Sequence, residues 1–333
     1  MRTAIIHEWL VNYAGSERVL EQIVRLYPDA DLFCQVDFLQ DDERGFVLNK
    51  KANTSFIQKL PFARSKYRNY LPLMPLAVRR LDVTGYDVII SNSHSVAKGI
   101  KKRAGQFQIC YCHTPMRYAW DLREQYLRES GLDAGLKGAV INFILDRIKS
   151  WDYNTAQQVD YFIANSYYIQ DRIKRSYGRD STVIYPPVDI DAFQLNENKD
   201  NYFLAASRMV SYKKMDMIVE AFSENGLPLV VIGDGPDFEK VKNRAKKNIE
   251  FLGFQGNSVL IEYMRKARAF IFAAEEDFGI IPVEAQACGT PVIAYGKGGV
   301  AESVIPYQNT EHRAQNTDKM SSPTGVFFDE QTP

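Results

Sequence analysis

Short apolar runs rich in β-branched residues alternate with longer amphipathic stretches along most of this sequence. The run Val88-Ile89-Ile90 is typical, because it shows no polar alternation and therefore predicts a strand buried on both faces, as in a parallel sheet. Segments with helical spacing separate such runs, for example Ser16–Tyr27, Asp216–Phe222 and Ser258–Arg268. Strand–helix alternation of this kind predicts α/β domains built on doubly wound parallel sheets.

The strand candidates fall into two series. The first comprises Thr3–Trp9, Asp87–Ser93, Phe107–His113, Tyr161–Asn165 and Ser181–Tyr185. The second comprises Tyr202–Ser207, Leu229–Gly233, Ile249–Leu252, Ala269–Ala273 and Pro291–Tyr295. Between the two series, Pro186 and Pro187 fix an extended linker. We therefore predict two Rossmann-like domains, residues 1–186 and 187–333, that face each other across a cleft.

Composition narrows the classes of function. The chain has 333 residues, with 41 basic and 41 acidic side chains, so no overall charge draws it to nucleic acid or membrane. The four cysteines lack the spacing of a zinc site and are expected to be buried thiols in a reducing compartment. We see no secretory signal and no apolar run of membrane-spanning length, so we expect a cytoplasmic protein.

The segment from Phe272 to Pro291 carries the strongest signal of chemistry. An apolar strand ends in three acids that include Glu276, and a glycine turn and a short helix with Glu284 follow. Open α/β sheets bind ligands at the carboxyl ends of strands, and a helix N-terminus suits a phosphate. The amides placed for this are those of Gly279, Ile280 and Ile281. Helix capping explains one acid but not the whole set.

The stretch E-D-F-G-I-I-P-V-E-A-Q-A-C-G-T-P, from Glu276 to Pro291, resembles a motif of retaining GT-B glycosyltransferases. These form family 4, also called glycosyl transferases group 1, and their common form is close to E-G-F-G-L-P-x-x-E-A-x-A-x-G-x-P. Asp277 stands where glycine is usual, and the proline is shifted by one residue. The resemblance implies that Glu276 contacts the hydroxyls of the donor sugar and that Glu284 binds the ribose.

Other segments of the second domain resemble the same family. Arg208 and Lys213 match two cations that bind the donor pyrophosphate there, where fixed positive charge stabilises the leaving diphosphate. Without the glutamate motif they would be interpreted as a solvated basic loop. Gly233 matches a strand end of the nucleotide domain, and Phe254 lies in a segment that resembles the loop around the nucleobase.

Two segments of the first domain also resemble the family. Trp9–Val19 resembles the loop G-G-A-E-R-V after the first strand, with Ala14 replacing a glycine, and Gly15 would let amides approach the donor phosphate. Cys110–Asp121, C-Y-C-H-T-P-M-R-Y-A-W-D, resembles a subgroup of bacterial polysaccharide assembly. Its His113 matches a histidine near the transferred sugar. A lone histidine is more often structural, but its place at a strand end favours a site.

The resemblance implies hexose transfer from a nucleotide diphosphate to an acceptor hydroxyl, without metal or other cofactor. Two Asp-x-Asp pairs, at residues 29–31 and 189–191, are interpreted as turn acids because neither lies at the carboxyl end of a strand. GDP-mannose is the favoured donor, with UDP-sugars as the alternative. The expected acceptor is a polyprenyl-diphosphate-linked glycan of O-antigen or exopolysaccharide synthesis, at the inner face of the cytoplasmic membrane.

Three further expectations concern a basic stretch, a polar stretch and the end of the second domain. Lys59–Arg80 carries six cations, many apolar residues and no acid, so it either lies on anionic lipid or is a solvated crossover broken by three prolines. Pro306–Pro323 is polar and patternless and predicts a mobile loop before a strand at Gly325–Asp329. The family's last helices would follow Pro333, so the second domain is expected to lack them.

Two functions from other classes stay open. One is a sugar-nucleotide epimerase of the same fold, which would need acid and base groups at C2 of the sugar. The other is a non-catalytic protein that binds nucleotide-sugars.

Overall fold

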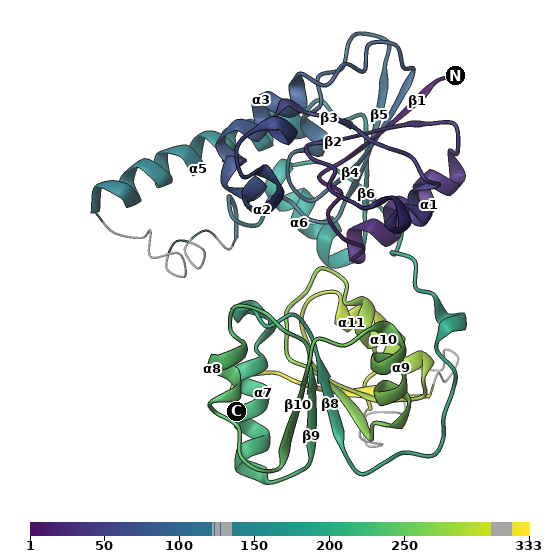
Figure 1. The fold of residues 1–333 in the computed structure, drawn as a ribbon, viewed down its shortest axis with the longest axis vertical. Coiled ribbons are helices and arrows are strands. Elements are labelled where there is room, and N and C mark those ends of the chain that lie inside the picture. The colour runs from purple at the N-terminus through teal and green to yellow at the C-terminus, as the bar shows by residue number, and fades with distance from the viewer. Residues whose placement is uncertain (122, 124–126, 128–134, 308–321) are drawn as a thin grey trace. The chain divides into compact units, whose positions relative to one another are not determined.

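The computed structural model describes residues 1–333 except 122, 124–126, 128–134 and 308–321 (Figure 1). The chain divides into two compact units, Met1–Pro187 and Val188–Pro333. This division falls one residue after the boundary predicted at the proline pair. Each unit is an α/β domain with one parallel sheet.

The first unit contains a seven-stranded sheet in the order β3-β2-β1-β4-β5-β6-β7, with every neighbouring pair parallel. Its strands are β1 (Thr3–His7), β2 (Asp31–Cys34), β3 (Asn53–Thr54), β4 (Val88–Ser93), β5 (Phe107–Cys112), β6 (Tyr161–Ala164) and β7 (Thr182–Val183). Its helices are α1 (Gly15–Leu26), α2 (Ala63–Lys66), α3 (Met74–Arg79), α5 (Gly135–Ala156) and α6 (Tyr167–Tyr177).

Helices cover both faces of this sheet. Successive side chains of a strand point to opposite faces, so adjacent residues of β1 contact different helices. Ile5 of β1 packs in one cluster with Leu20 of α1. Its neighbour Ile6 packs in another cluster with Met74 of α3 and Ile148 of α5. The two buried layers explain why the strands of this sheet read as continuous apolar runs.

The second unit contains a six-stranded sheet in the order β10-β9-β8-β11-β12-β13, again parallel throughout. Its strands are β8 (Phe203–Ala206), β9 (Leu229–Ile232), β10 (Ile249–Gly253), β11 (Ala269–Phe272), β12 (Val292–Tyr295) and β13 (Gly325–Phe328). Its helices are α7 (Met215–Asn225), α8 (Phe238–Lys242), α9 (Asn257–Lys266), α10 (Ile280–Ala287) and α11 (Val300–Ser303).

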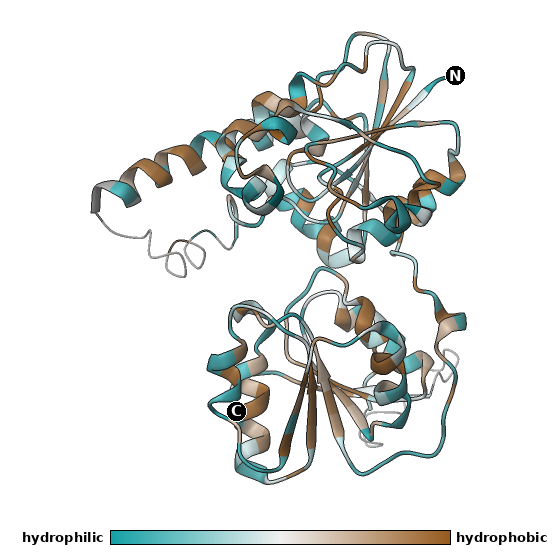
Figure 2. Ribbon diagram, in the orientation of Figure 1, coloured by the Kyte–Doolittle hydropathy of each residue, from teal (hydrophilic) through white to brown (hydrophobic). Residues whose placement is uncertain are grey.

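This second sheet is also covered on both faces. Ala205 packs with Phe222 of α7, whereas the adjacent Leu204 packs with Met264 of α9 and Ala285 of α10. Figure 1 shows α7 and α8 on one side of the sheet and α9 and α10 on the other, and Figure 2 shows the apolar character of β8, β9 and β10 between them.

All ten strands predicted in the two series are present, as is the one predicted near Gly325. The two series missed β2 and β3. β2 has only three apolar residues, Leu32 to Cys34, after an aspartate interpreted as a turn acid. Asn53 and Thr54 of β3 are polar residues of an edge strand without an apolar run. The Lys59–Arg80 stretch is broken into α2, α3 and intervening 3₁₀ turns, as its prolines suggest. Most of the predicted mobile loop, 306–323, lies outside the described residues.

All four cysteines are free and buried, which confirms the expectation of buried thiols. In the part of the chain that the structure describes, no helix is both long and apolar enough to cross a membrane.

Candidate functional site

The strand order of each sheet reverses beside the first strand of its unit. In the first unit the chain continues from β1 to β2 on one side and later adds β4 on the other. In the second unit β8 is flanked in the same way by β9 and β11. The loops that leave such a strand pair diverge, and open α/β sheets bind ligands in the crevice at its carboxyl ends. In both units, polar side chains lie just after the strands at which the order reverses.

At the reversal in the second unit, Lys213 and Glu276 meet. Lys213 lies in the turn after β8 and Glu276 in the loop after β11, and their ammonium and carboxylate groups form an ion pair. The two side chains are 17% and 18% exposed. Arg208, two residues after β8, is exposed and forms no ion pair or side-chain hydrogen bond with any residue that the structure describes. Arg208 is therefore a cation at this strand end that no described side chain pairs with.

Glycines let the backbone pack closely around this ion pair. Gly233, at the end of β9, has a φ of 134°, and a Cβ atom there would lie 1.9 Å from the carbonyl oxygen of Ser207. A Cβ atom on Gly298 would lie 2.5 Å from the carbonyl oxygen of Glu276. The amide of Gly299 donates a 2.8 Å hydrogen bond to that same oxygen. The loops that carry the ion pair are therefore fixed by close backbone contacts that only glycine permits.

Helix α10 begins beside Glu276. Gly279 precedes it with a φ of 83° and has no side chain that could cap the helix. Ile280 and Ile281 are its first two residues, so their N–H groups have no partner within the helix. An anion that bound here would be stabilised by these N–H groups and by the helix dipole.

Two other predicted ligand contacts differ in exposure. Glu284 lies in α10 and is 4% exposed, so it offers a ligand only a small surface. Phe254 follows β10 and is 78% exposed, so its ring is available for stacking. The roles of both residues stay predictions.

At the reversal in the first unit, the buried carboxylate of Glu8 holds the loop after β4. It accepts a hydrogen bond from the Ser93 hydroxyl and further bonds from the amides of Ser95, Val96 and Ala97, at 2.7 to 3.1 Å. Burial alone would raise the pKa of Glu8, but the charge of His94 and the amide hydrogen bonds outweigh it and lower the pKa. A single internal anion thus fixes the backbone that follows β4.

A row of four polar side chains runs through the same strand ends. His7 ends β1 and is the register partner of Asn92 in β4. The Nε2 atom of His7 lies 3.1 Å from the Glu17 carboxylate, and its Nδ1 atom lies 3.1 Å from the Asn92 side-chain nitrogen. The Asn92 side-chain oxygen lies 2.6 Å from Nε2 of His113, which directly follows β5. Gly15, the exposed first residue of α1, lies two residues before Glu17 of this row.

The pKa values in this row favour fixed protonation states. Burial lowers the pKa of His113 to about 3, so the ring is neutral at physiological pH. Burial alone would raise the pKa of Glu17, but the hydrogen bonds from His7 and Ser16 outweigh it and lower the pKa to about 2. Glu17 is therefore a carboxylate.

His113 was predicted from the sequence, but the polar cluster that it forms with His7, Glu8, Glu17 and Asn92 was not. A signal was available, because polar residues directly end or follow two apolar strand runs, at His7-Glu8 and at Asn92-Ser93. What it lacked was the strand order, which brings these two ends together.

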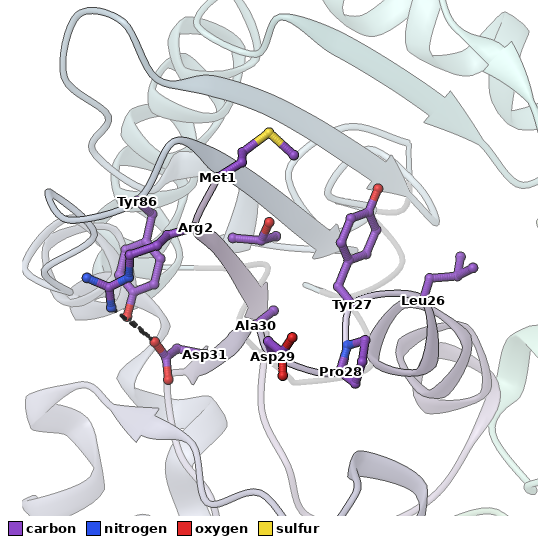
Figure 3. A pocket seen from close by; sticks show the side chains of 10 residues that line it. Met1, Arg2, Leu26, Tyr27, Pro28, Asp29, Ala30, Asp31 and Tyr86 are labelled. Carbon is purple, nitrogen blue, oxygen red and sulfur yellow. Dashed lines mark hydrogen bonds and ion pairs between the residues drawn. The ribbon is translucent and has the colours of Figure 1, made fainter.

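A separate pocket opens at the opposite, amino edge of the first sheet (Figure 3). Asp31 lies there, accepts a 2.7 Å hydrogen bond from the Tyr86 hydroxyl and lies 3.5 Å from the Arg2 guanidinium. Since ligands of such sheets bind at the carboxyl ends of strands, we do not assign this pocket to the site. Among the described residues no group of three potential metal ligands comes together.

Comparison with protein families matches both halves of the chain. The model of Glycosyltransferase Family 4 matches residues 13–192, and that of Glycosyl transferases group 1 matches residues 188–322. Among solved structures, HepE of Anabaena in complex with UDP and glucose superposes with a TM-score of 0.69 at 17% identity, covering 100% of this chain and 87% of that one. This likeness shows the shared fold, which confirms the predicted GT-B class of two α/β domains with parallel sheets.

Two relatives share more sequence over shorter stretches. An uncharacterized glycosyltransferase of Methanocaldococcus jannaschii is 32% identical over 155 residues, which cover 45% of this chain and 44% of the relative. A GDP-mannose-dependent monoacylated α-(1-6)-phosphatidylinositol monomannoside mannosyltransferase of Corynebacterium glutamicum is 26% identical over 196 residues, 49% of this chain and 51% of the relative. The matched stretches thus span about half the length of these relatives.

Replacing Glu8 by Gln should destabilise the first unit. The variant loses the charge and sets an NH₂ group against amide donors, so we expect a loss of roughly 2–4 kcal/mol. Hydrogen exchange at Ser95, Val96 and Ala97 measures this locally, which avoids assuming two-state unfolding of a two-unit chain. Asp42→Asn, an exposed carboxylate in the same unit, is the control and should leave exchange at these amides unchanged.

The effect of Glu8 should depend on pH. Because folding lowers its pKa, the stabilisation is complete above the unfolded value of about 4.3 and is lost as the pH falls through the folded value. The difference between wild type and Glu8→Gln should therefore shrink on acidification below about pH 4.3. A difference that grew instead would contradict the charged carboxylate.

Proposed function

We propose a function for this chain on the premise that it belongs to glycosyltransferase family 4, whose model matches more than half of it. It is a retaining hexosyltransferase that moves a sugar from a nucleotide diphosphate to an acceptor hydroxyl. The observation that carries this proposal is the reversal point of the second sheet. There Arg208, Lys213 and the start of α10 supply positive potential beside the carboxylate of Glu276.

The chemistry needs such an arrangement because the leaving group is a nucleoside diphosphate. As the bond between the sugar C1 and the β-phosphate oxygen breaks, negative charge grows on that oxygen, and fixed cations and amides stabilise it. The acceptor oxygen forms the new bond to C1 from the same face. Its proton passes to the departing phosphate oxygen, so no protein nucleophile is required.

Lys213 and Glu276 have complementary roles in this proposal. Without donor, each neutralises the other across the strand ends. With donor bound, Lys213 contacts the pyrophosphate together with Arg208, and Glu276 accepts hydrogen bonds from the sugar hydroxyls. Glu284 binds the ribose, Phe254 stacks on the base, and His113 and Gly15 contribute from the first unit.

We favour mannose from GDP-mannose as the donor. The segment around His113 resembles mannosyltransferases of O-antigen and exopolysaccharide pathways, and the relative from Corynebacterium is named as GDP-mannose-dependent. UDP-sugars are the alternative, supported by the bound UDP and glucose of HepE. Under the proposal the acceptor is a polyprenyl-linked glycan at the cytoplasmic membrane.

A basic surface of the first unit supports a membrane-bound acceptor. Residues 59–80 expose six cations and no acid. Phe62 is 75% exposed with a φ of 57°, and the ammonium group of Lys66 lies 5.8 Å from its ring centroid. Leu73 and Leu76 are 41% and 47% exposed. Exposed apolar side chains among cations are typical of segments that lie on anionic lipid.

A panel of GDP, UDP, ADP and their hexose conjugates should identify the donor by thermal shift. A nucleotide at 100 times its dissociation constant should stabilise the second unit by about 2.7 kcal/mol. Arg208→Ala should weaken this stabilisation. Arg268→Ala, an exposed arginine at the amino edge of the same sheet, should not. If no nucleotide stabilised the protein, the proposed function would be wrong.

Glu276→Ala and Lys213→Ala should each lower the transfer rate roughly 100-fold, because each removes a group that acts on the sugar or on the leaving diphosphate. Glu276→Ala should keep nucleotide binding, since its contact is with the sugar. Glu250→Ala and Lys247→Ala are controls at exposed positions of the same unit. Product analysis separates transfer from epimerisation of the donor. Full transfer by Glu276→Ala would refute its role.

The double variant Arg64→Ser/Lys66→Ser should bind anionic phospholipid vesicles less tightly. Each cation near such a surface is worth about 1 kcal/mol, so the partition coefficient should fall roughly 30-fold. Lys246→Ser/Lys247→Ser removes the same charge from an exposed site in the second unit and should bind as wild type does. Equal binding by both variants would exclude residues 59–80 as the membrane contact.

A further inference from the structure

The row Glu17–His7–Asn92–His113 has a defined direction of hydrogen bonding. The Asn92 side-chain nitrogen lies 2.9 Å from the backbone carbonyl of Ser16. A carbonyl oxygen only accepts, so the atom that faces it must be the NH₂ group of Asn92. This one contact fixes the orientation of the Asn92 amide.

The remaining protons follow from that orientation. The second N–H of Asn92 donates to Nδ1 of His7, so His7 carries its proton on Nε2 and donates it to Glu17. On the other side, the Asn92 oxygen can only accept, so Nε2 of His113 carries a proton. Every hydrogen of the Asn92 amide is therefore used, and the row has one consistent arrangement.

This arrangement leaves Nδ1 of His113 as a lone pair. No residue that the structure describes forms a hydrogen bond with that atom, and the His113 side chain is partly exposed. The groups that face the ring are the Tyr111 ring at 5.1 Å and the His94 ring at 6.3 Å, with His7 and Glu17 behind Asn92. None of them supplies a donor to Nδ1.

We propose that Asn92 is a positioning residue that holds His113 in its Nε2–H tautomer, so that Nδ1 accepts a hydrogen bond from a sugar hydroxyl. His7 and Glu17 act one step further back, because they fix the amide of Asn92. This inference rests on the proposed function for the identity of the hydroxyl. The tautomer itself follows from the geometry of the first unit.

The tautomer can be measured without any donor. In protein labelled with ¹⁵N in its four histidines, long-range ¹H–¹⁵N spectra show which ring nitrogen carries the proton, and His113→Gln assigns the signal. We expect His113 to show a protonated Nε2 and an unprotonated Nδ1. Asn92→Ala should mix the two tautomers. Ser91→Ala, a buried residue of the same strand that hydrogen-bonds to Ile109, is the control and should leave the His113 signal unchanged.

Kinetics separate positioning from a purely structural role. Asn92→Ala should lower transfer roughly 10-fold at every pH. Asn92→Asp should instead raise the pKa of His113, because it places a carboxylate beside the ring, with His7 Nδ1 and the Ser16 carbonyl on its other side. Its transfer activity should therefore be low in acid and should recover as the pH rises. A structural defect would give no such recovery.

The possible failures are distinguishable. A proton on Nδ1 of His113 in the wild type, or an unchanged signal in Asn92→Ala, would overturn the positioning role and leave the transferase proposal intact. An Asn92→Asp activity that did not recover with pH would also overturn it. A wild type that transferred no sugar would overturn the proposed function and, with it, the hydroxyl partner of His113.

Discussion

Parallel pairing of the first strand of each unit with strands on both sides is the constraint on which the rest of the structure depends. Hydrogen bonds to β2 and β4 fix β1, and hydrogen bonds to β9 and β11 fix β8. Because all strands of a sheet run in the same direction, their carboxyl ends lie along one edge. Each connection between neighbouring parallel strands must therefore cross over a face of the sheet. The connections run in opposite directions on the two sides of the first strand, so the loops at its carboxyl end diverge and leave a crevice.

The crevices beside β1 and β8 differ in their electrostatics. In the first unit the charged groups are buried and each has partners. Backbone amides bind Glu8, and His7 binds Glu17. Lys98 forms a buried ion pair with Asp152, which also accepts hydrogen bonds from Trp120 and Tyr177. Such groups are costly unless every partner is in place, so they specify one loop conformation. In the second unit Arg208 is exposed and α10 begins without a side-chain cap, so that edge is suited to an anion.

Much of the fold and part of the site could be predicted from the sequence. Apolar runs such as Val88–Ile90 predicted their strands because burial on both faces requires them, and the glutamate motif predicted a helix start at Gly279. The short strands β2 and β3 were not predicted. β2 offers only a brief apolar run, and β3 lies at a sheet edge, where backbone hydrogen bonds need no particular side chain. The polar row that ends at His113 was not predicted either, since its members lie up to 85 residues apart in the sequence.

The sequence by itself determined which segments form strands and helices, and it placed two cations and two glutamates after strands of the second unit. These are local properties, set by side-chain polarity and by glycine and proline. Only the tertiary structure decided that β11 lies beside β8, so that Glu276 meets Lys213, and that β4 lies beside β1, so that Asn92 meets His7. The physical reason is that backbone hydrogen bonds are the same for every strand. The choice of neighbour is therefore made by packing across the whole domain and leaves no local pattern to read.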